Sequence, residues 1–285
     1  MKGKATVIYI LSNQRSGSTL LENILSKSPQ MTSVGELFLL DGHIHKRGPG
    51  YAWDWNCSCD KSFTECDFWD KVFEKLQIND PKEIQNTKIL PPNGKNSKSI
   101  KSTNDETKSL INKIYAAVSK ISGNNIIVDS SKEPFNGTNL YLNSPYNFKF
   151  IYLKRDLRAV TISKYKWRKK DGKKKVGHLK LLLANYHHRI KSWFLLRSVR
   201  KKDVYKLKYE DFFEEPQKKL DEMADFFGFD SFEMPTHMEL KNDHTIAGTP
   251  NRFQKREIKY DDRWLDLSKK KPVFNFLGLI LNRLG

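Results

Sequence analysis

Short apolar runs alternate with amphipathic segments along most of the 285-residue chain. The apolar runs are rich in β-branched and aromatic residues and break at polar ones, which is typical of buried strands; they lie in Thr6–Leu11, Asn125–Pro134, Asn147–Asp156 and Val204–Phe212. Apolar positions at helical spacing occur in Ser18–Lys27, Leu157–Lys170, His178–Lys202 and Pro216–Gly228. Strands that alternate with helices predict an α/β fold whose parallel sheet is covered on both faces.

This alternation lapses between about residues 41 and 110. Residues 43–69 contain several glycine, proline and tryptophan residues and all three cysteines of the chain, and residues 79–109 are mostly Lys, Asn, Ser and Thr. The first part is interpreted as a Cys- and Trp-rich subdomain, and the second predicts an exposed, flexible connection. We therefore expect one domain over residues 1–285, with an insert at about 41–110.

Composition and charge narrow the class of partner. The chain has 51 Lys and Arg against 33 Asp and Glu, a formal charge of +18, which favours anionic partners. Nucleic acid is not expected, because the sequence contains no recognisable binding module and few aromatic residues lie within its basic run. The N-terminal apolar run is too short for a signal peptide or a membrane span, and three cysteines do not suit a secreted disulfide scaffold. We therefore expect a cytoplasmic protein.

The loop after the first predicted strand nearly matches a phosphate-binding loop. The common motif is G-x-x-x-x-G-K-[ST], and here Gly17 and Thr19 stand at the last glycine and hydroxyl positions, with Ser18 in place of the lysine. Arg15 supplies a cation two residues before the glycine, and the N–H groups at a helix start also attract anions. This loop suits an anion of lower charge than a magnesium-bound triphosphate.

A second anion site is predicted near the later strand ends, since ligands of such sheets bind at the carboxyl ends of the strands. Arg155 ends the third predicted strand and Ser163 lies about two helical turns further on, so a helix directs both toward one point. The competing interpretation is that Arg155 pairs with Asp156 or Glu210. Two separate anion sites suggest a nucleotide that carries phosphates at both ends.

These motifs together resemble the sulfotransferase superfamily, whose donor is 3′-phosphoadenosine 5′-phosphosulfate (PAPS). In that family R-S-G-[ST]-T forms the 5′-phosphosulfate loop, which matches Arg15–Thr19, and R-D-x-R-A-x-x-x-S forms the 3′-phosphate site, which matches Arg155–Ser163. The segments "DSSKEPF" and "YEDF" and residues 244–264 extend the likeness, which is greatest to bacterial and tyrosylprotein-sulfotransferase-like members. It covers about residues 6–264 apart from the polar connection, and it implies a P-loop NTPase-like three-layer α/β/α fold.

The resemblance implies that the chain moves the sulfonate of PAPS in line to a hydroxyl or amine and releases 3′-phosphoadenosine 5′-phosphate (PAP). The implied catalytic residues are Arg15 and Lys132 as cations and Glu36 as general base, with His244 as the reserve base. Tyrosylprotein members have two consecutive glutamates where this chain has Glu36 and Leu37, and bacterial members usually have asparagine in place of Thr249. The residues implied to bind the donor are Arg15, Ser16, Gly17, Ser18, Thr19, Leu20, Arg155, Ser163, Tyr209 and Arg252.

Two alternatives stay open at this point. An ATP-dependent kinase of the phosphate-loop class is the other enzyme hypothesis, because Asp129 ends an apolar strand where a magnesium-holding aspartate could lie. The cysteines could bind zinc, form a disulfide or do neither, and their spacing contains no regular C-x-x-C pair. Sulfonyl transfer itself requires no metal, and none is assigned. The side chains offered for zinc are His43, His45, Cys57, Cys59 and Cys66.

The sequence leaves the acceptor and the oligomeric state open. Small molecules, glycans, lipids and peptides all remain candidate acceptors, since variable inserts form the acceptor pockets of this family. The apolar terminal segment Phe274–Gly285 is expected to dock on the core as a helix, with peripheral contact to a membrane surface as the alternative.

Overall fold

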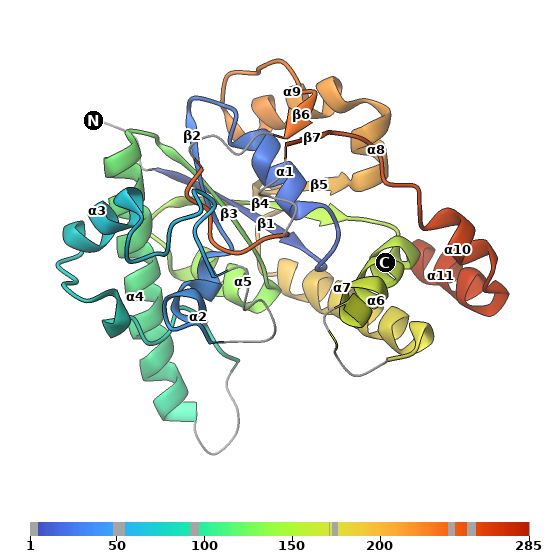
Figure 1. The fold of residues 1–285 in the computed structure, drawn as a ribbon, viewed down its shortest axis with the longest axis horizontal. Coiled ribbons are helices and arrows are strands. Elements are labelled where there is room, and N and C mark those ends of the chain that lie inside the picture. The colour runs from blue at the N-terminus through green and yellow to red at the C-terminus, as the bar shows by residue number, and fades with distance from the viewer. Residues whose placement is uncertain are drawn as a thin grey trace.

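A computed structural model of the protein describes residues 5–47, 55–91, 97–170, 172, 176–238, 243–249 and 255–284. Its centre is a five-stranded sheet in which all neighbouring strands are parallel (Figure 1). The strand order is β2-β3-β1-β4-β5, with β1 at Thr6–Ser12, β2 at Met31–Gly35, β3 at Ile126–Lys132, β4 at Asn147–Lys154 and β5 at Val204–Lys208. The predicted α/β class with a parallel central sheet is confirmed.

Helices cover both faces of this sheet, because successive side chains of a strand point to opposite faces. In β1, Val7, Tyr9 and Leu11 pack into one apolar core, whereas Ile8 and Ile10 pack into another. The first core lies under α2 (Leu40–Ile44), α3 (Asp67–Lys75), α4 (Ser97–Ser122) and α5 (Pro134–Asn143). The second lies under α1 (Ser18–Leu25), α8 (Tyr209–Glu214) and α9 (Pro216–Phe227). The chain therefore forms the three layers α/β/α.

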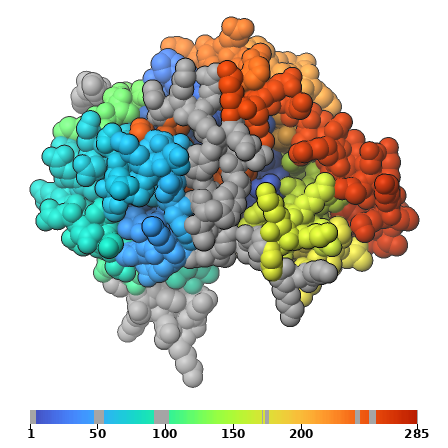
Figure 2. Space-filling model, viewed as in Figure 1, coloured from blue at the N-terminus to red at the C-terminus, as the bar shows by residue number. Residues whose placement is uncertain are grey.

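A third apolar cluster holds the C-terminal helices against the helices that follow β4. It joins α6 (Leu157–Lys170), α7 (His178–Leu196), α10 (Leu265–Lys269) and α11 (Pro272–Leu284). The packing of α11 on α6 is so close that a Cβ atom on Gly278 would lie 2.3 Å from Cγ of Arg158. Figure 2 shows the red C-terminal helices against the yellow-green α6, at the opposite end of the molecule from the cyan insert. The expected docking of the C-terminal segment is confirmed.

The outward side of α11 carries exposed apolar residues, among them Val273, Phe276 and Leu284. No helix in the described part of the chain is both long and apolar enough to cross a membrane. Contact of this side with a membrane surface stays a prediction.

Several elements differ from the predicted pattern. The strand β2 was not predicted, because it mixes Thr32 and Ser33 with apolar residues and ends at a glycine. The fourth predicted strand stops at Lys208, where α8 begins. The short elements are 3₁₀ helices at Leu37–Leu39, Pro81–Glu83 and Lys201–Asp203 and an antiparallel pair of β6 (His237–Met238) with β7 (Arg256–Glu257).

The connection expected to be flexible within the 41–110 insert is partly helical, since its last residues form the first half of α4. Polar side chains there bind neighbouring segments. The Asn104 side chain donates to the carbonyl oxygen of Leu90 at 2.7 Å and accepts from its N–H at 2.9 Å. Thr107 Oγ1 accepts from the Asn86 side chain at 3.0 Å. Where the structure describes it, this polar segment is therefore held to neighbouring parts of the chain.

Candidate active site

The loop between β1 and α1 has the backbone shape of an anion-binding turn. Gly17 is the N-cap residue of α1 with a φ of 96°, and Arg15 has a φ of 74°. A positive φ is uncommon for a residue other than glycine, and such strain concentrates at functional sites. The first N–H groups of a helix have no partner within the helix, so the start of α1 can bind an anion.

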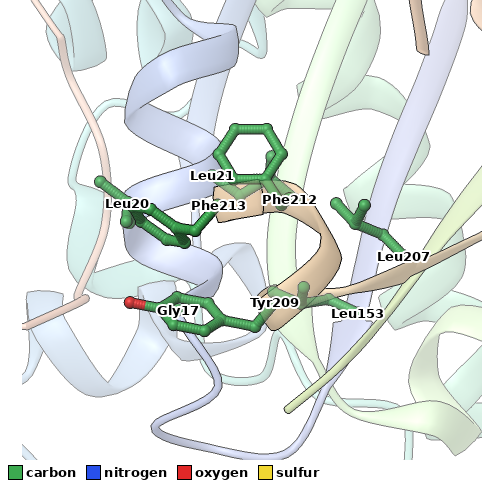
Figure 3. A pocket seen from close by; sticks show the side chains of 8 residues that line it. All are labelled: Gly17, Leu20, Leu21, Leu153, Leu207, Tyr209, Phe212 and Phe213. Carbon is green, nitrogen blue, oxygen red and sulfur yellow. The ribbon is translucent and has the colours of Figure 1, made fainter. Parts of the chain in front are cut away.

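Gly17 also makes room for Tyr209, the first residue of α8. A Cβ atom on Gly17 would lie 2.6 Å from two ring carbons of Tyr209. Figure 3 shows the Tyr209 ring beside Gly17, with the side chains of Leu20 and Phe213 nearby. The apolar cavity between these residues measures about 10 Å³, roughly the room for one water molecule, and is too small for a nucleotide base. Tyr209, one of the residues implied to bind the donor, thus packs on the phosphate loop.

Lys132 and Glu36 form an ion pair at the ends of two adjacent strands. Glu36 follows β2 and Lys132 ends β3, and these strands pair in parallel. The Nζ of Lys132 donates to Oε1 of Glu36, and both residues are nearly buried. Lys132 has a φ of 67° and so shares the left-handed backbone of Arg15. A proton acceptor and a positive charge thus lie side by side.

Arg155 and Arg15 belong to one network of contacts. Nη1 of Arg155 donates to the carbonyl oxygen of Arg15 at 3.4 Å, and Nε of Arg15 donates to Oγ of Ser163 at 3.1 Å. Nη2 of Arg155 lies 3.3 Å from Oδ2 of Asp261, and its Cζ lies 4.2 Å from the centre of the Tyr209 ring. The phosphate loop and the residues implied to bind the 3′-phosphate therefore adjoin each other.

Arg155 pairs with Asp261 and not with Asp156 or Glu210, the partners of the competing interpretation. Oδ2 of Asp156 accepts from Arg158 at 2.6 Å, and Glu210 accepts from the N–H of Asp156 at 2.9 Å. The buried Nε of Arg155 has no hydrogen-bond partner among the residues that the structure describes. The guanidinium of Arg155 thus keeps one donor that no described residue uses.

All these groups meet at one cleft of about 1140 Å³ at the carboxyl edge of the sheet. Its described lining includes ten of the sequence-implied residues, namely Arg15, Gly17, Ser18, Thr19, Leu20, Glu36, Lys132, Arg155, Ser163 and Tyr209. Basic side chains outnumber acidic ones there, and the basic side chains include Lys166, Lys170 and Arg256. Ser16 is buried instead, with its N–H bonded to the Asn13 carbonyl at 3.3 Å. Arg252 lies outside the described residues.

Asp129, the residue on which the kinase alternative depends, is engaged inside the core. It is 1% exposed and accepts from the Tyr115 hydroxyl at 2.6 Å and from the Ser131 N–H at 2.8 Å. Burial raises the pKa of this carboxyl to about 6. Asp129 is not among the residues that line the cleft, so nothing in its surroundings favours a magnesium site.

Glu22 is a second buried carboxyl, and it makes stability depend on pH. It lies on α1 and accepts from Ser130 Oγ at 2.6 Å and from Ser33 Oγ. Burial raises its pKa from 4.5 to about 7. Between these values the folded chain keeps a proton that the unfolded chain has lost, so the free energy of unfolding falls as the pH rises through this window.

We therefore expect Glu22→Gln to gain stability relative to the native chain by about 2–3 kcal/mol between pH 5 and pH 8. Glutamine keeps the shape and one acceptor oxygen but has no proton to lose. Urea unfolding of both proteins across this range measures the difference. Parallel pH profiles for the two proteins would show that Glu22 is not the titrating group.

Four side chains of metal-ligating types gather where the insert meets residues 243–249, in a combination that the sequence did not suggest. The group is Cys57, Cys59, Cys66 and His244. His43 instead packs against aromatic rings, and His45 Nε2 lies 2.9 Å from the Ile84 carbonyl oxygen. His244, the reserve base, turns its Nδ1 toward Cys66 at 3.2 Å and is not among the cleft-lining residues.

Comparison with known proteins finds a matching family model and similar solved structures. A family model described as "Sulfotransferase family" matches residues 8–233. The structure is similar to the sulfotransferase domain from the curacin biosynthetic pathway, with 17% identity, a TM-score of 0.58, and coverage of 94% of this chain and 92% of that one. It is also similar to the sulfotransferase domain from the Synechococcus PCC 7002 olefin synthase, with 21% identity, a TM-score of 0.54, and coverage of 93% and 88%. A search of curated proteins gave no match. The expected P-loop NTPase-like fold is confirmed.

Proposed function

Because this chain belongs to the sulfotransferase family, we propose that it transfers the sulfonate of PAPS to a hydroxyl or amine of an acceptor and releases PAP. The observation that carries the proposal is the meeting of Arg15, Lys132 and Arg155 with the carboxylate of Glu36 in one cleft. Sulfonyl transfer needs positive charge around the reacting group and a base for the acceptor proton. This cleft offers both.

The phosphosulfate end of the donor binds at the start of α1, where the loop presents Arg15, the hydroxyls of Ser18 and Thr19, and backbone N–H groups. The 3′-phosphate binds at Arg155, whose buried Nε is a donor without a partner in the described chain, and at Ser163. Gly17 and Leu20 line the cleft beside these groups, the buried Ser16 belongs to the same loop, and Tyr209 packs on it from the α8 side. Arg252 stays a proposed donor ligand from the sequence alone.

The reaction proceeds by in-line displacement at sulfur. The acceptor oxygen or nitrogen forms a bond to sulfur while the bond from sulfur to the bridging oxygen of the 5′-phosphate breaks, and that oxygen keeps the electron pair in PAP. The acceptor proton passes to the carboxylate of Glu36, and the charges of Lys132 and Arg15 stabilise the sulfonate and the bridging oxygen. Glu36 is preferred to His244 because Glu36 lines the cleft.

The acceptor enters the same cleft from the side of the insert. A volume of about 1140 Å³ exceeds the size of an ordinary small-molecule pocket, so it holds a nucleotide and part of an acceptor together. Phe38, Trp55 and Trp167 line it and offer apolar contact surface. We propose a small-molecule acceptor with an apolar portion, ahead of a glycan, a lipid or a peptide.

Binding of PAP and transfer of label from ³⁵S-PAPS test this proposal. We expect PAP to bind the full chain in isothermal titration calorimetry. The acceptors to be screened for the label are p-nitrophenol and other simple phenols, sugars and amines. Arg15 and Lys132 supply the positive charge that magnesium provides in phosphoryl transfer, so labelling should proceed without added magnesium. Binding of ATP with magnesium in place of PAP would overturn the proposal in favour of a kinase.

A further inference from the structure

A cluster of four side chains joins the insert to residues 243–249, and no part of the proposed reaction uses it. The ligand atoms of Cys57, Cys59, Cys66 and His244 all lie within 4.8 Å of one another. We propose that they bind a zinc ion that fixes the insert to the segment beside Glu36. The zinc binding stands on its own, whereas the positioning role rests on the proposed function.

The separations of the ligand atoms match a tetrahedral zinc site. Sulfur bonded to zinc at about 2.3 Å in a tetrahedron lies about 3.8 Å from the next sulfur. Here Sγ of Cys66 is 3.6 Å from that of Cys59 and 3.7 Å from that of Cys57. Nδ1 of His244 is 3.2 Å from Cys66 and 3.8 Å from Cys57. One ion at the centre of these four atoms therefore reaches all of them.

The chemistry and burial of the ligands favour a structural zinc site. Thiolate and imidazole together suit Zn²⁺ better than magnesium or calcium, which prefer oxygen. Cys57 and Cys66 are fully buried, and four protein ligands leave no open position for a substrate. Binding converts three thiols to thiolates, releases their three protons to solvent and uses a neutral imidazole. This site is therefore separate from the proposed sulfonyl transfer.

The surrounding backbone is arranged to support sulfur ligands. The N–H groups of Cys59, Lys61 and Trp69 donate to the sulfurs of Cys57, Cys59 and Cys66 respectively. The N–H of Cys57 donates to the Lys61 carbonyl at 2.9 Å and closes the turn between the first two cysteines. Such outer contacts orient metal ligands and stabilise thiolate charge.

A disulfide explains less of this arrangement. It would join two of the cysteines and leave the third thiol and the imidazole without a role, and all three cysteines are free thiols here. His244 is also held in place. Its ring stacks on Phe68 with ring centres 4.8 Å apart, and its backbone carbonyl oxygen accepts from Trp69 Nε1 at 2.8 Å. A positioned imidazole beside three sulfurs is what zinc requires.

The metal would act on the active site through the backbone. Thr245, next to His244, forms two hydrogen bonds with Ser58. The N–H of Thr245 donates to Oγ of Ser58 at 2.9 Å, and the N–H of Ser58 donates to the carbonyl oxygen of Thr245 at 3.2 Å. The following residue, Ile246, accepts from the N–H of Glu36 at 2.8 Å. The short orange-red segment in Figure 1 runs beside the cyan insert at this point. The zinc ion thus fixes the residue that holds the proposed base.

Metal content and thiol counts of the purified full-length chain test the binding directly. We expect one zinc per chain by elemental analysis, and no thiol that reacts with Ellman's reagent before the metal is removed. Titration with mercuribenzoate should release the zinc as the thiols react, and the chain contains no cysteine outside the cluster. A metal-free chain that takes up neither Zn²⁺ nor Co²⁺, with either three reactive thiols or one thiol and a disulfide, would overturn the proposal.

Paired substitutions at His244 separate a ligand from a packing residue. His244→Cys should keep the metal, because it retains a fourth ligand, whereas His244→Phe should lose metal affinity about 10-fold or more although it keeps the aromatic stack. His237→Ala removes an exposed histidine elsewhere and should leave the metal content unchanged. Metal retained in His244→Phe would contradict the ligand role.

The two proposals fail in different ways. Loss of zinc with normal PAP binding and a lowered turnover supports the positioning role, and loss of zinc with unchanged turnover overturns that role but not the site. A chain that binds zinc but neither PAP nor PAPS would refute the proposed function and leave the zinc site standing.

Discussion

Lys132→Met is expected to lower the turnover of sulfonate transfer about 10³-fold. Methionine removes the ammonium group proposed to stabilise the bridging oxygen of the leaving phosphate. It also leaves the carboxylate of Glu36 nearly buried without its ion-pair partner, which costs about 3–5 kcal/mol of stability. Turnover with saturating ³⁵S-PAPS and urea unfolding measure the two effects separately.

A double variant shows whether the loss of activity is only a loss of stability. Lys132→Met with Glu36→Leu removes both charges of this buried pair, so it should recover most of the stability lost in the single variant. Its turnover should remain at least as low, because both proposed catalytic groups are gone. Lys191→Met is the matched control, since its ion pair with Glu133 is partly exposed and should contribute less than about 1 kcal/mol. Activity that returned with stability would contradict the assigned roles.

Arg155→Ala is expected to raise the dissociation constant of PAP about 100-fold. Hydrogen bonds to a charged group contribute about 2–3 kcal/mol, and the guanidinium of this arginine belongs to a residue that lines the cleft. Turnover at saturating donor should change much less, because Arg155 is proposed to bind the 3′-phosphate and not the reacting sulfonate. Calorimetric titration and initial rates at several PAPS concentrations distinguish the two quantities.

Adenosine 5′-phosphate, which lacks the 3′-phosphate, makes this test specific. Arg155→Ala should bind it almost as well as the native chain does, whereas Arg15→Ala should weaken the binding of both nucleotides. Arg197→Ala removes an exposed arginine elsewhere and controls for the general attraction of a chain with a charge of +18. If Arg155→Ala weakened both nucleotides equally, the 3′-phosphate assignment would be wrong.

The residues that could be placed from the sequence are those that follow parallel strands. Arg15 follows β1, Lys132 ends β3 and Arg155 follows β4, and the carboxyl ends of parallel strands meet at one edge of a sheet. Strand order was not needed to bring them together. Glu36 was harder to place, because the mixed, short β2 before it gives no clear strand pattern.

The contacts between these residues could not be predicted in the same way. The sequence places Ser163 near Arg155, yet in the structure Oγ of Ser163 accepts from Arg15. Asp261 pairs with Arg155 across 106 positions of chain, and no local pattern marks such a partner. His244 is far from the cysteines in the sequence. A search for ligands close to them in the sequence therefore selected His43 and His45 instead.

The outermost strand β2 has a consequence for how copies of this chain behave together. A strand at the rim of a sheet normally offers its free backbone groups to a second molecule, which invites aggregation. Here Ile246 forms a parallel bridge with Gly35, and a Cβ atom at that glycine would lie 2.2 Å from the Ile246 carbonyl oxygen. Because Gly35 has no side chain, Ile246 can pair with the outer edge of β2 at this residue. A strand of another molecule cannot pair with β2 there.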